Sequence, residues 1–358
     1  MKVAFHQKVK LNNANKLRLQ QINAIVEEYR RKGYILTLRQ LYYQLVSRGT
    51  IANRIEEYRK LSKILTLGRM AGIVHWDAIE DRLRQVDTPS SWNSPYDIMN
   101  TVVKQYAAPL QEGQKNYIEV WVEKDALSGV LSRVTRPFHI PIMVNRGYSS
   151  VSAIFDSYER FAKHLKAGQT VTILYMGDFD PSGVDMIRDV YDRPLEMLLA
   201  KANEIALTYD PDGDYDNLYN KWVSDGRSWS NGNDEDDESG IPGEYFNPYK
   251  AYILERFKVE AIALTLDQIE QHNPPPNPAK IDDPRAADFI SKYGNHSWEV
   301  DALLPEVLDA ILREAIETRI DLDLYEAMVE RQEKERAILK KLRAKAPNAY
   351  GAFEDDEE

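Results

Sequence analysis

Three acidic residues follow two segments that have the composition of buried β-strands. Glu123 ends the apolar run 117–122, and Asp178 and Asp180 follow the apolar run 171–176. Carboxylates at the carboxyl ends of parallel strands lie where open α/β sheets bind their ligands. Side chains that offer only oxygen suit a hard divalent cation such as Mg²⁺ or Mn²⁺. The sequence therefore predicts a metal site at Glu123, Asp178 and Asp180, suited to phosphoryl transfer.

The acidic residues and their neighbours also have structural interpretations. The sequence from Asp178 to Gly183 has the composition of an ordinary turn that caps a helix. Lys124 and Asp125 have the positions of a helix N-terminus, with Asp125 as its cap. Glu123 has no such structural reason to follow an apolar strand, so metal binding is the favoured interpretation of the three carboxylates.

A pair of tyrosines forms the second candidate group. Thr37 has the character of an N-cap, and the pattern that follows predicts a helix over residues 38–46. Tyr42 belongs to the apolar stripe of this helix, whereas Tyr43 shares a polar face with Arg39, one turn earlier. We therefore expect Tyr42 to be buried and Tyr43 to be accessible, with the Arg39 guanidinium placed to hold a phosphate. An accessible tyrosine hydroxyl can attack phosphorus once its proton is removed, although tyrosine pairs within helices are also common in simple packing.

The composition excludes several other kinds of chemistry. The chain of 358 residues has no cysteine, which rules out disulfides, thiolate zinc sites and cysteine nucleophiles. Its six histidines are scattered without the spacing of a metal site. No apolar stretch approaches the roughly 20 residues needed to span a bilayer, so we expect a cytoplasmic protein.

Charge is distributed unevenly along the chain. Residues 1–110 contain 18 Lys and Arg against 9 Asp and Glu, a net charge of +9, whereas residues 111–358 contain 28 against 48, a net charge of −20. A basic module is expected to follow a phosphate backbone, while an acidic one repels nucleic acid unless cations screen it. The asymmetry favours a DNA-binding domain joined to a metal-binding domain, with a solvated basic face as the alternative. The predicted phosphate contacts are Arg39, Arg48 and Arg146, of which Arg146 could also be a surface arginine beside a turn glycine.

Residues 1–110 have the pattern of a small helical DNA-binding domain. Helical periodicity predicts three helices, followed by a short strand and a further helix, at residues 15–32, 38–46, 56–71, 73–76 and 77–84. Helices of this length joined by short turns, with a small strand pair, are typical of a winged helix-turn-helix. Residues 85–115 contain three prolines and are predicted to connect this domain to the next.

Residues 111–330 have the alternating pattern of an α/β domain. The predicted strands are 118–122, 140–144 and 171–176, and the predicted helices are 125–134, 151–165 and 183–190. This βαβ order predicts a parallel, Rossmann-like sheet. The strongly acidic segment 208–245 interrupts it and is predicted to be an inserted, mobile surface loop. The remaining predictions are a strand within 252–263, a stiff proline linker at 274–278, helices at 284–293, 304–318 and 322–344, and, over 331–358, the end of the last helix with an acidic tail.

The motifs together resemble those of a known family. Similarity to the A subunit of topoisomerase VI and its meiotic double-strand-break relatives is carried by Arg39-x-x-Tyr42-Tyr43, Glu123 and Asp178-x-Asp180. Short bacterial and phage-borne relatives of that subunit are the closer comparison, and recognisable motifs cover residues 35–190. The resemblance implies a winged-helix domain followed by a Toprim domain, in a bacterial or phage-encoded protein that associates with the nucleoid.

The resemblance also implies roles for single residues. In that family the second aromatic residue of the pair is the nucleophile, which becomes linked to a 5′ DNA end, and the match places it on Tyr43. The glutamate and the two aspartates hold Mg²⁺ there, and they match Glu123, Asp178 and Asp180. A homodimer is implied, in which the tyrosine of one subunit meets the metal site of the other. The chain has no phosphate-binding loop, so strand passage would require a separate ATPase or B-type subunit, and the acidic insertion 208–245 has no assigned counterpart.

Three hypotheses for the function follow. In the first, the chain is a topoisomerase-like transesterase in which Tyr43 attacks the scissile phosphate of double-stranded DNA, with Arg39 and Glu123 assisting. In the second, it is a Toprim-type nuclease in which a metal-activated water is the nucleophile. In the third, it is a DNA-binding scaffold whose acidic residues are structural.

Overall fold

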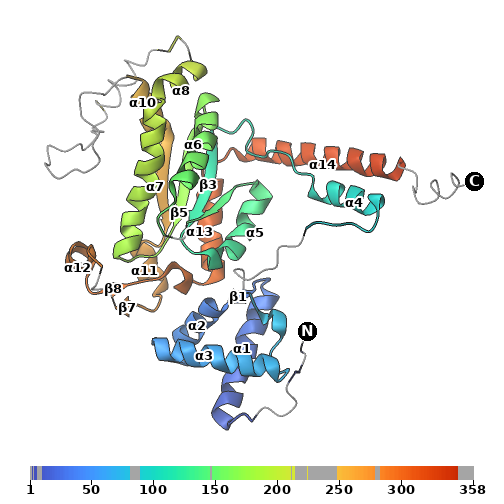
Figure 1. The fold of residues 1–358 in the computed structure, drawn as a ribbon, viewed down its shortest axis with the longest axis vertical. Coiled ribbons are helices and arrows are strands. Elements are labelled where there is room, and N and C mark those ends of the chain that lie inside the picture. Colours follow the sequence, from blue (N-terminus) through green and yellow to red (C-terminus); the bar gives the residue numbers. More distant parts are fainter. Residues whose placement is uncertain are drawn as a thin grey trace, which may run out of the picture.

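The fold is mixed α/β, with a four-stranded parallel sheet at its centre and a helical unit at its N-terminal end (Figure 1). The computed structural model describes residues 10–80, 89–145, 147–210, 248–278 and 283–345, together with a few isolated positions. Arg146, most of the acidic insertion 208–245 and the acidic tail lie outside these described residues. Within them, no helix combines the length and apolar character that crossing a bilayer requires.

The N-terminal unit consists of three helices and a short strand pair. The helices are α1 (Asn13–Arg31), α2 (Leu38–Ser47) and α3 (Ile55–Met70), and β1 (Leu36–Thr37) pairs in parallel with β2 (Ile79–Glu80). The three predicted helices are confirmed to within two residues at each end. The predicted strand 73–76 is wrong, because the chain there bends into a short 3₁₀ turn, η1 (Trp76–Ala78), before β2. The predicted helix 77–84 is also wrong in its first four residues, which belong to η1 and β2. Residues 81–84 lie outside the described residues.

Local sequence explains where α2 begins. The Thr37 hydroxyl accepts a hydrogen bond from the Gln40 N–H, and the Gln40 side chain accepts one from the Thr37 N–H. This reciprocal capping box satisfies two backbone donors at the helix start. It fixes the direction of the helix that carries Arg39 and Tyr43.

Two helices far apart in the sequence form an arm that projects from the sheet (Figure 1). They are α4 (Pro95–Gln105) and α14 (Leu322–Lys345). The Arg343 side chain donates to Asn100 Oδ1 at 2.6 Å, and the Ala108 N–H donates to Gln332 Oε1 at 2.8 Å. Helix α4, which the prediction placed in the N-terminal domain 1–110, therefore packs on α14.

The central sheet has the strand order β4–β3–β5–β6, with every neighbouring pair parallel. Its strands are β3 (Asn116–Val122), β4 (Ile142–Val144), β5 (Thr170–Met176) and β6 (Phe257–Ala263). The first three confirm the predicted strands. The predicted strand within 252–263 is right only in its second half, because residues 252–256 belong to helix α10.

The remaining elements connect and cover these strands. They are η2 (Asp125–Leu127), α5 (Ser128–Phe138), α6 (Val151–Lys166), α7 (Pro181–Ala200), α8 (Ala202–Tyr209), α10 (Pro248–Arg256), α11 (Leu266–His272), β7 (Asn277–Pro278), α12 (Ala286–Tyr293), β8 (His296–Ser297), η4 (Val300–Ala302) and α13 (Pro305–Glu317). The short strand β7, at the end of the predicted proline linker 274–278, pairs in antiparallel fashion with β8, which follows the predicted helix 284–293.

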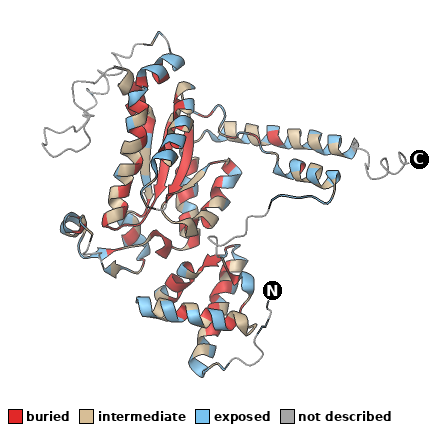
Figure 2. Ribbon diagram, viewed as in Figure 1, coloured by how far each residue is buried: buried red, intermediate tan, exposed pale blue. Residues whose placement is uncertain are grey.

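Helices cover both faces of the sheet, so its central strands β3 and β5 are almost wholly buried, whereas the edge strands β4 and β6 are more exposed (Figure 2). Alternate residues of β3 point to opposite faces: Ile118 and Val120 pack toward α5 and α13, whereas Tyr117 and Trp121 pack toward α6 and α10. Burial on both faces is the usual state of a parallel sheet and explains why these strands are apolar throughout. The hydrophobic core on the Ile118 and Val120 side of the sheet continues into α1, α2 and α3. The N-terminal unit therefore packs directly on the α/β part.

Candidate functional site

The sheet places two of the predicted acidic residues side by side. The chain leaves β3 toward β4 on one side and later enters β5 on the other side, so the ends of β3 and β5 flank a topological switch point. Glu123 directly follows β3, and its N–H donates to the Met176 carbonyl at 3.0 Å. Its Oε2 accepts a hydrogen bond from the Asp178 N–H at 3.1 Å. Glu123 and Asp178, two of the three predicted metal ligands, therefore lie next to each other at this edge of the sheet.

Asp180 has a structural role in this arrangement. It is the N-cap of α7, and its Oδ1 accepts hydrogen bonds from the Gly183 N–H at 2.7 Å and the Ser182 hydroxyl at 2.8 Å. Gly183 is required there because a Cβ would lie 2.1 Å from the Asp178 carbonyl oxygen. The helix-capping interpretation of this turn is therefore confirmed for Asp180.

The centre of the site is a lysine that the sequence analysis interpreted as part of a helix N-terminus. Lys124 Nζ lies 2.8 Å from Asp178 Oδ1, 3.0 Å from Glu299 Oε2 and 2.9 Å from Asp301 Oδ1. The N–H of Val300, between those last two carboxylates, donates to Asp178 Oδ1 at 2.9 Å. One ammonium group thus joins carboxylates that follow β5 to carboxylates at η4.

Glu299 and Asp301 were not predicted from the sequence. Glu299 is the N-cap of η4 and Asp301 lies within it, far along the chain from β3 and β5, and Asp301 is completely buried beside Lys124. The signal that could have identified them is an Asp in an otherwise apolar stretch, 300–304, because a charge there requires a partner. We call Lys124, Asp178, Glu299, Asp301 and Arg39 the charge cluster.

The pKa values within the charge cluster are driven in opposite directions. Burial raises the pKa of Asp178 to about 7, although its ion pair with Lys124 acts against this. Burial alone would also raise the pKa of Glu299, but the nearby Lys124 and Arg39 outweigh it and lower that pKa to about 2. Burial raises the pKa of Asp301 as well. Near neutral pH, Glu299 is thus a fixed negative charge, whereas Asp178 can gain or lose a proton.

Tyr43 is buried, which contradicts the prediction that it is accessible. Its side chain is only 3% exposed, and its hydroxyl accepts a hydrogen bond from Asn277 Nδ2 at 3.4 Å. Helix α2, which carries Tyr43, packs against η4 of the same chain. Burial raises the pKa of Tyr43, and Glu299 and Asp301 raise it further. In this arrangement the phenol therefore keeps its proton.

Tyr42 is buried as predicted, with a separate set of partners. Its hydroxyl donates to Asn53 Oδ1 at 2.8 Å, and its ring meets the ring of Tyr43 edge-on, with 5.3 Å between the centroids. The Asn53 amide donates in turn to Asn277 Oδ1 at 3.0 Å. The two tyrosines therefore lie in one polar interface between the N-terminal unit and the α/β part.

The predicted phosphate-contacting arginines are engaged with acidic groups. Arg39 contacts Glu299, and its Nε lies 3.4 Å from Asp301 Oδ2. Arg48, the C-cap of α2, pairs with Glu28 at 2.9 Å and is partly exposed. The prediction for Arg146 falls outside the described residues.

The three predicted metal ligands do not fit a cation in the arrangement seen. Among the residues that the structure describes, no three or more acidic or histidine side chains are grouped so that they could hold a metal ion. The physical reason is that Asp180 caps α7, while Asp178 is held by Lys124 and the Val300 N–H. The donor type suits Mg²⁺, but an ammonium already neutralises this acidic site.

The arrangement combines a phenol, two cations and several carboxylates at one edge of a parallel sheet. Comparisons with models of protein families, with curated proteins and with solved structures find no match to this chain. Chemically, such a site can bind an anionic group through Lys124 and Arg39 and can exchange a proton at Asp178.

Proposed function

We propose that this chain is a DNA-breaking transesterase similar to the topoisomerase VI A subunit, with Tyr43 as its nucleophile. The observation that carries the proposal is the position of Tyr43. Tyr43 lies on the second helix of the basic N-terminal unit, which packs against η4, and the nearby charges of Glu299 and Asp301 in the charge cluster raise the pKa of its hydroxyl. A tyrosine used only for packing would not require two cations and several carboxylates around it.

The reaction would proceed through a covalent intermediate. The Tyr43 oxygen attacks phosphorus, the bond from phosphorus to O3′ breaks, and the tyrosine stays linked to the 5′ end while O3′ takes up a proton. Of the carboxylates in the charge cluster, Asp178 would receive the phenolic proton, because Glu299, with its pKa of about 2, stays ionised. Because the pKa of Asp178 lies near 7, this residue is the better reservoir for returning a proton to O3′. Lys124 and Arg39 would stabilise the negative charge of the phosphate.

A divalent cation could take part in the reaction only if two of the predicted ligand side chains changed position. Mg²⁺ or Mn²⁺ would be held by Glu123, Asp178 and Asp180, and it would reduce the repulsion between these carboxylates and DNA. Asp178 would first have to leave Lys124, and Asp180 would have to leave the N-terminus of α7. The roles proposed above for Tyr43, Lys124 and Arg39 do not depend on it.

The proposal also requires the N-terminal unit to move. With Tyr43 buried against η4 of its own chain, a duplex cannot reach the hydroxyl. Separation would expose Tyr43 and free Arg39, and in a homodimer it would let the tyrosine of one subunit meet the charge cluster of the other. A separate ATPase or B-type subunit is the kind of partner that could drive such a movement.

The test is a cleavage assay with supercoiled plasmid and Mg²⁺ or Mn²⁺, stopped with detergent and divided into samples with and without protease. The wild type should yield broken DNA that carries protein on its 5′ ends. Tyr43→Phe should abolish these adducts, because it removes only the attacking oxygen. Tyr42→Phe is the matched control: it removes the neighbouring hydroxyl, which binds Asn53, and should keep the adducts. Adducts that survive Tyr43→Phe would exclude this residue as the nucleophile.

The second candidate function is a hydrolytic nuclease, which the burial of Tyr43 favours. In that case Tyr43 is a packing residue, and water attacks the phosphate. Tyr43→Phe would then leave cleavage intact, Asp178→Asn would abolish it, and the DNA ends would carry no protein. If DNA is bound without any break, the scaffold hypothesis gains support instead.

A further inference from the structure

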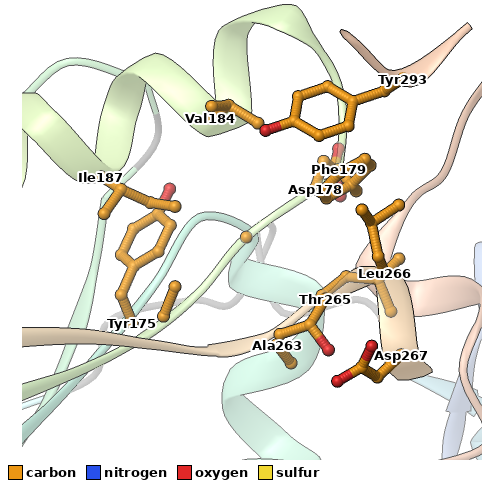
Figure 3. Close-up of a pocket in the computed structure, with 13 residues that line it drawn as sticks. Tyr175, Asp178, Phe179, Val184, Ile187, Ala263, Thr265, Leu266, Asp267 and Tyr293 are labelled. Carbon is orange, nitrogen blue, oxygen red and sulfur yellow. The ribbon is translucent and has the colours of Figure 1, made fainter. Parts of the chain in front are cut away.

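A cavity of about 360 Å³ lies beside the charge cluster, on the side of β6 (Figure 3). It is bounded by the ends of β5 and β6, by the first turns of α7 and α11, and by the end of α12. Of the charge cluster, only Asp178 belongs to its lining. The cavity is therefore a neighbour of the site described above rather than a part of it.

The walls of the cavity are largely aromatic and aliphatic. Tyr175 lies on one side, and Phe179 and Tyr293 lie on the other (Figure 3). Small residues on the sheet, Gly177 and Ala261 among them, leave the space between these rings open. A Cβ at Gly177 would lie 2.6 Å from the Tyr175 ring, so glycine is needed for the ring to lie there. A planar group fits between such walls better than a branched or extended one.

One polar group in the wall of the cavity has no hydrogen-bond partner in the described part of the chain. The Tyr175 side chain is 1% exposed, and its hydroxyl makes no hydrogen bond within the described part of the chain. A buried hydroxyl without a partner is unfavourable, so a ligand that supplies one gains affinity. Thr265 and the exposed Asp267 add polar groups to the lining, near the start of α11. The occupant that matches this lining is planar, apolar on its faces and polar on its edge.

We propose that this cavity binds a nucleobase, with its faces against the aromatic walls and its polar edge at the Tyr175 hydroxyl. The attached sugar and phosphate would then lie toward Asp178 and the charge cluster. The base can come from an unstacked nucleotide of bound DNA, in which case the inference rests on the proposed function, or from a free nucleotide. Bases that leave a duplex are held elsewhere by the same combination of stacking and edge contacts.

Photo-crosslinking with a 5-iodouracil base tests the proposal, because this base couples to nearby aromatic residues under light. One arm uses duplex DNA that contains the base, and the other uses free 5-iodo-deoxyuridine triphosphate, so the two sources are distinguished. The adduct should map by mass spectrometry to Tyr175, Phe179 or Tyr293 in at least one arm. Ala261→Leu, which fills the cavity from an exposed position, should lower the yield several-fold.

Tyr175→Phe supplies a second readout. Because it removes an unpartnered hydroxyl, its Tm should equal or exceed that of the wild type while the crosslink yield falls. Tyr252→Phe is the matched control: the Tyr252 hydroxyl donates to the Leu165 carbonyl at 2.6 Å, so its loss should lower Tm and leave the yield unchanged.

The outcomes separate this inference from the proposed function. Crosslinks that map elsewhere, or a yield that Ala261→Leu does not change, would overturn the nucleobase site even if the protein cuts DNA. Crosslinking of the free nucleotide at these residues, in a protein that neither binds nor cuts DNA, would support the site and overturn the proposed function.

Discussion

Lys124 decides the electrostatics of the site at the scale of single residues. Its ammonium is shared by three carboxylates, and removing one partner of a buried ion pair commonly costs about 3–5 kcal/mol because the other charge stays buried. Arg39 supplies the second positive charge from the N-terminal unit. The acidic edge of the sheet is thus partly neutralised by the chain itself, with two cations against three carboxylates, and an incoming phosphate or cation must exchange with these contacts.

Glu299 gives a pH-dependent test of this arrangement. Its folded-state pKa of about 2 lies below the ordinary value of 4.5, so its ionised form stabilises the fold above about pH 4.5, and the contribution is lost as the pH falls toward 2. Glu299→Gln should therefore be less stable than the wild type near neutral pH, and the difference should shrink as the pH falls from about 5 to about 3. Urea unfolding of both proteins across this range measures the difference. A difference that stays constant with pH would show that the Glu299 charge is not held by Lys124 and Arg39.

At the scale of elements, the sequence predicts the positions of those strands and helices that depend on local pattern. Apolar runs and their ends locate β3 and β5, and hence Glu123 and Asp178, because strand periodicity and the rule for parallel sheets are both local in origin. Capping residues locate α2 in the same way.

The contacts between elements could not be predicted in this way. The face of α2 that carries Arg39 and Tyr43 looks solvent-exposed in the sequence because it is polar. Tyr43 is buried because η4 covers it, and Arg39 on the same face contacts Glu299, the N-cap of η4, about 260 positions further along the chain. Hydrophobic periodicity carries no information about a polar interface of this kind. Lys124 was interpreted as part of a helix N-terminus for the same reason: its carboxylate partners at η4 come from a distant segment.

The N-cap of α2 should matter for the position of Tyr43. Thr37→Ala removes the hydroxyl that accepts from the Gln40 N–H, and loss of such a cap typically costs about 1 kcal/mol of stability. Thr37→Ser keeps the hydroxyl and should recover most of that loss. Chemical denaturation of the three proteins compares them directly. Equal destabilisation by alanine and serine would mean that the Thr37 methyl group, rather than its hydrogen bond, is what α2 requires.

At the scale of the whole molecule, ion pairs among the described residues hold the basic N-terminal unit against the acidic remainder at two places. One is the charge cluster with Tyr43. The other is on α13, where Lys32 Nζ lies 2.8 Å from Glu306 and the Tyr34 hydroxyl donates to Asp309 at 3.0 Å. DNA phosphates would compete with these carboxylates for the same basic groups. Binding of DNA and closure of the N-terminal unit should therefore oppose each other, and salt should weaken both.

A reversible crosslink across α13 tests this competition. Because the chain has no cysteine, Lys32→Cys and Glu306→Cys introduce the only two thiols, which a cleavable bismaleimide can join. With the bridge in place, Tyr43 stays buried, so DNA affinity and protein–DNA adducts should both fall, and cleavage of the linker should restore them.

The control joins two segments that should not separate. Asn100→Cys and Arg343→Cys, joined in the same way, bridge α4 to α14 within the arm and should leave DNA affinity and adducts unchanged. If the protein bridged at α13 binds and cleaves DNA as well as the released form, then Tyr43 either acts from its closed position or takes no part in the reaction. The Tyr43→Phe assay decides between these two explanations. Adducts should disappear in this variant if Tyr43 acts from its closed position, and should remain if Tyr43 takes no part.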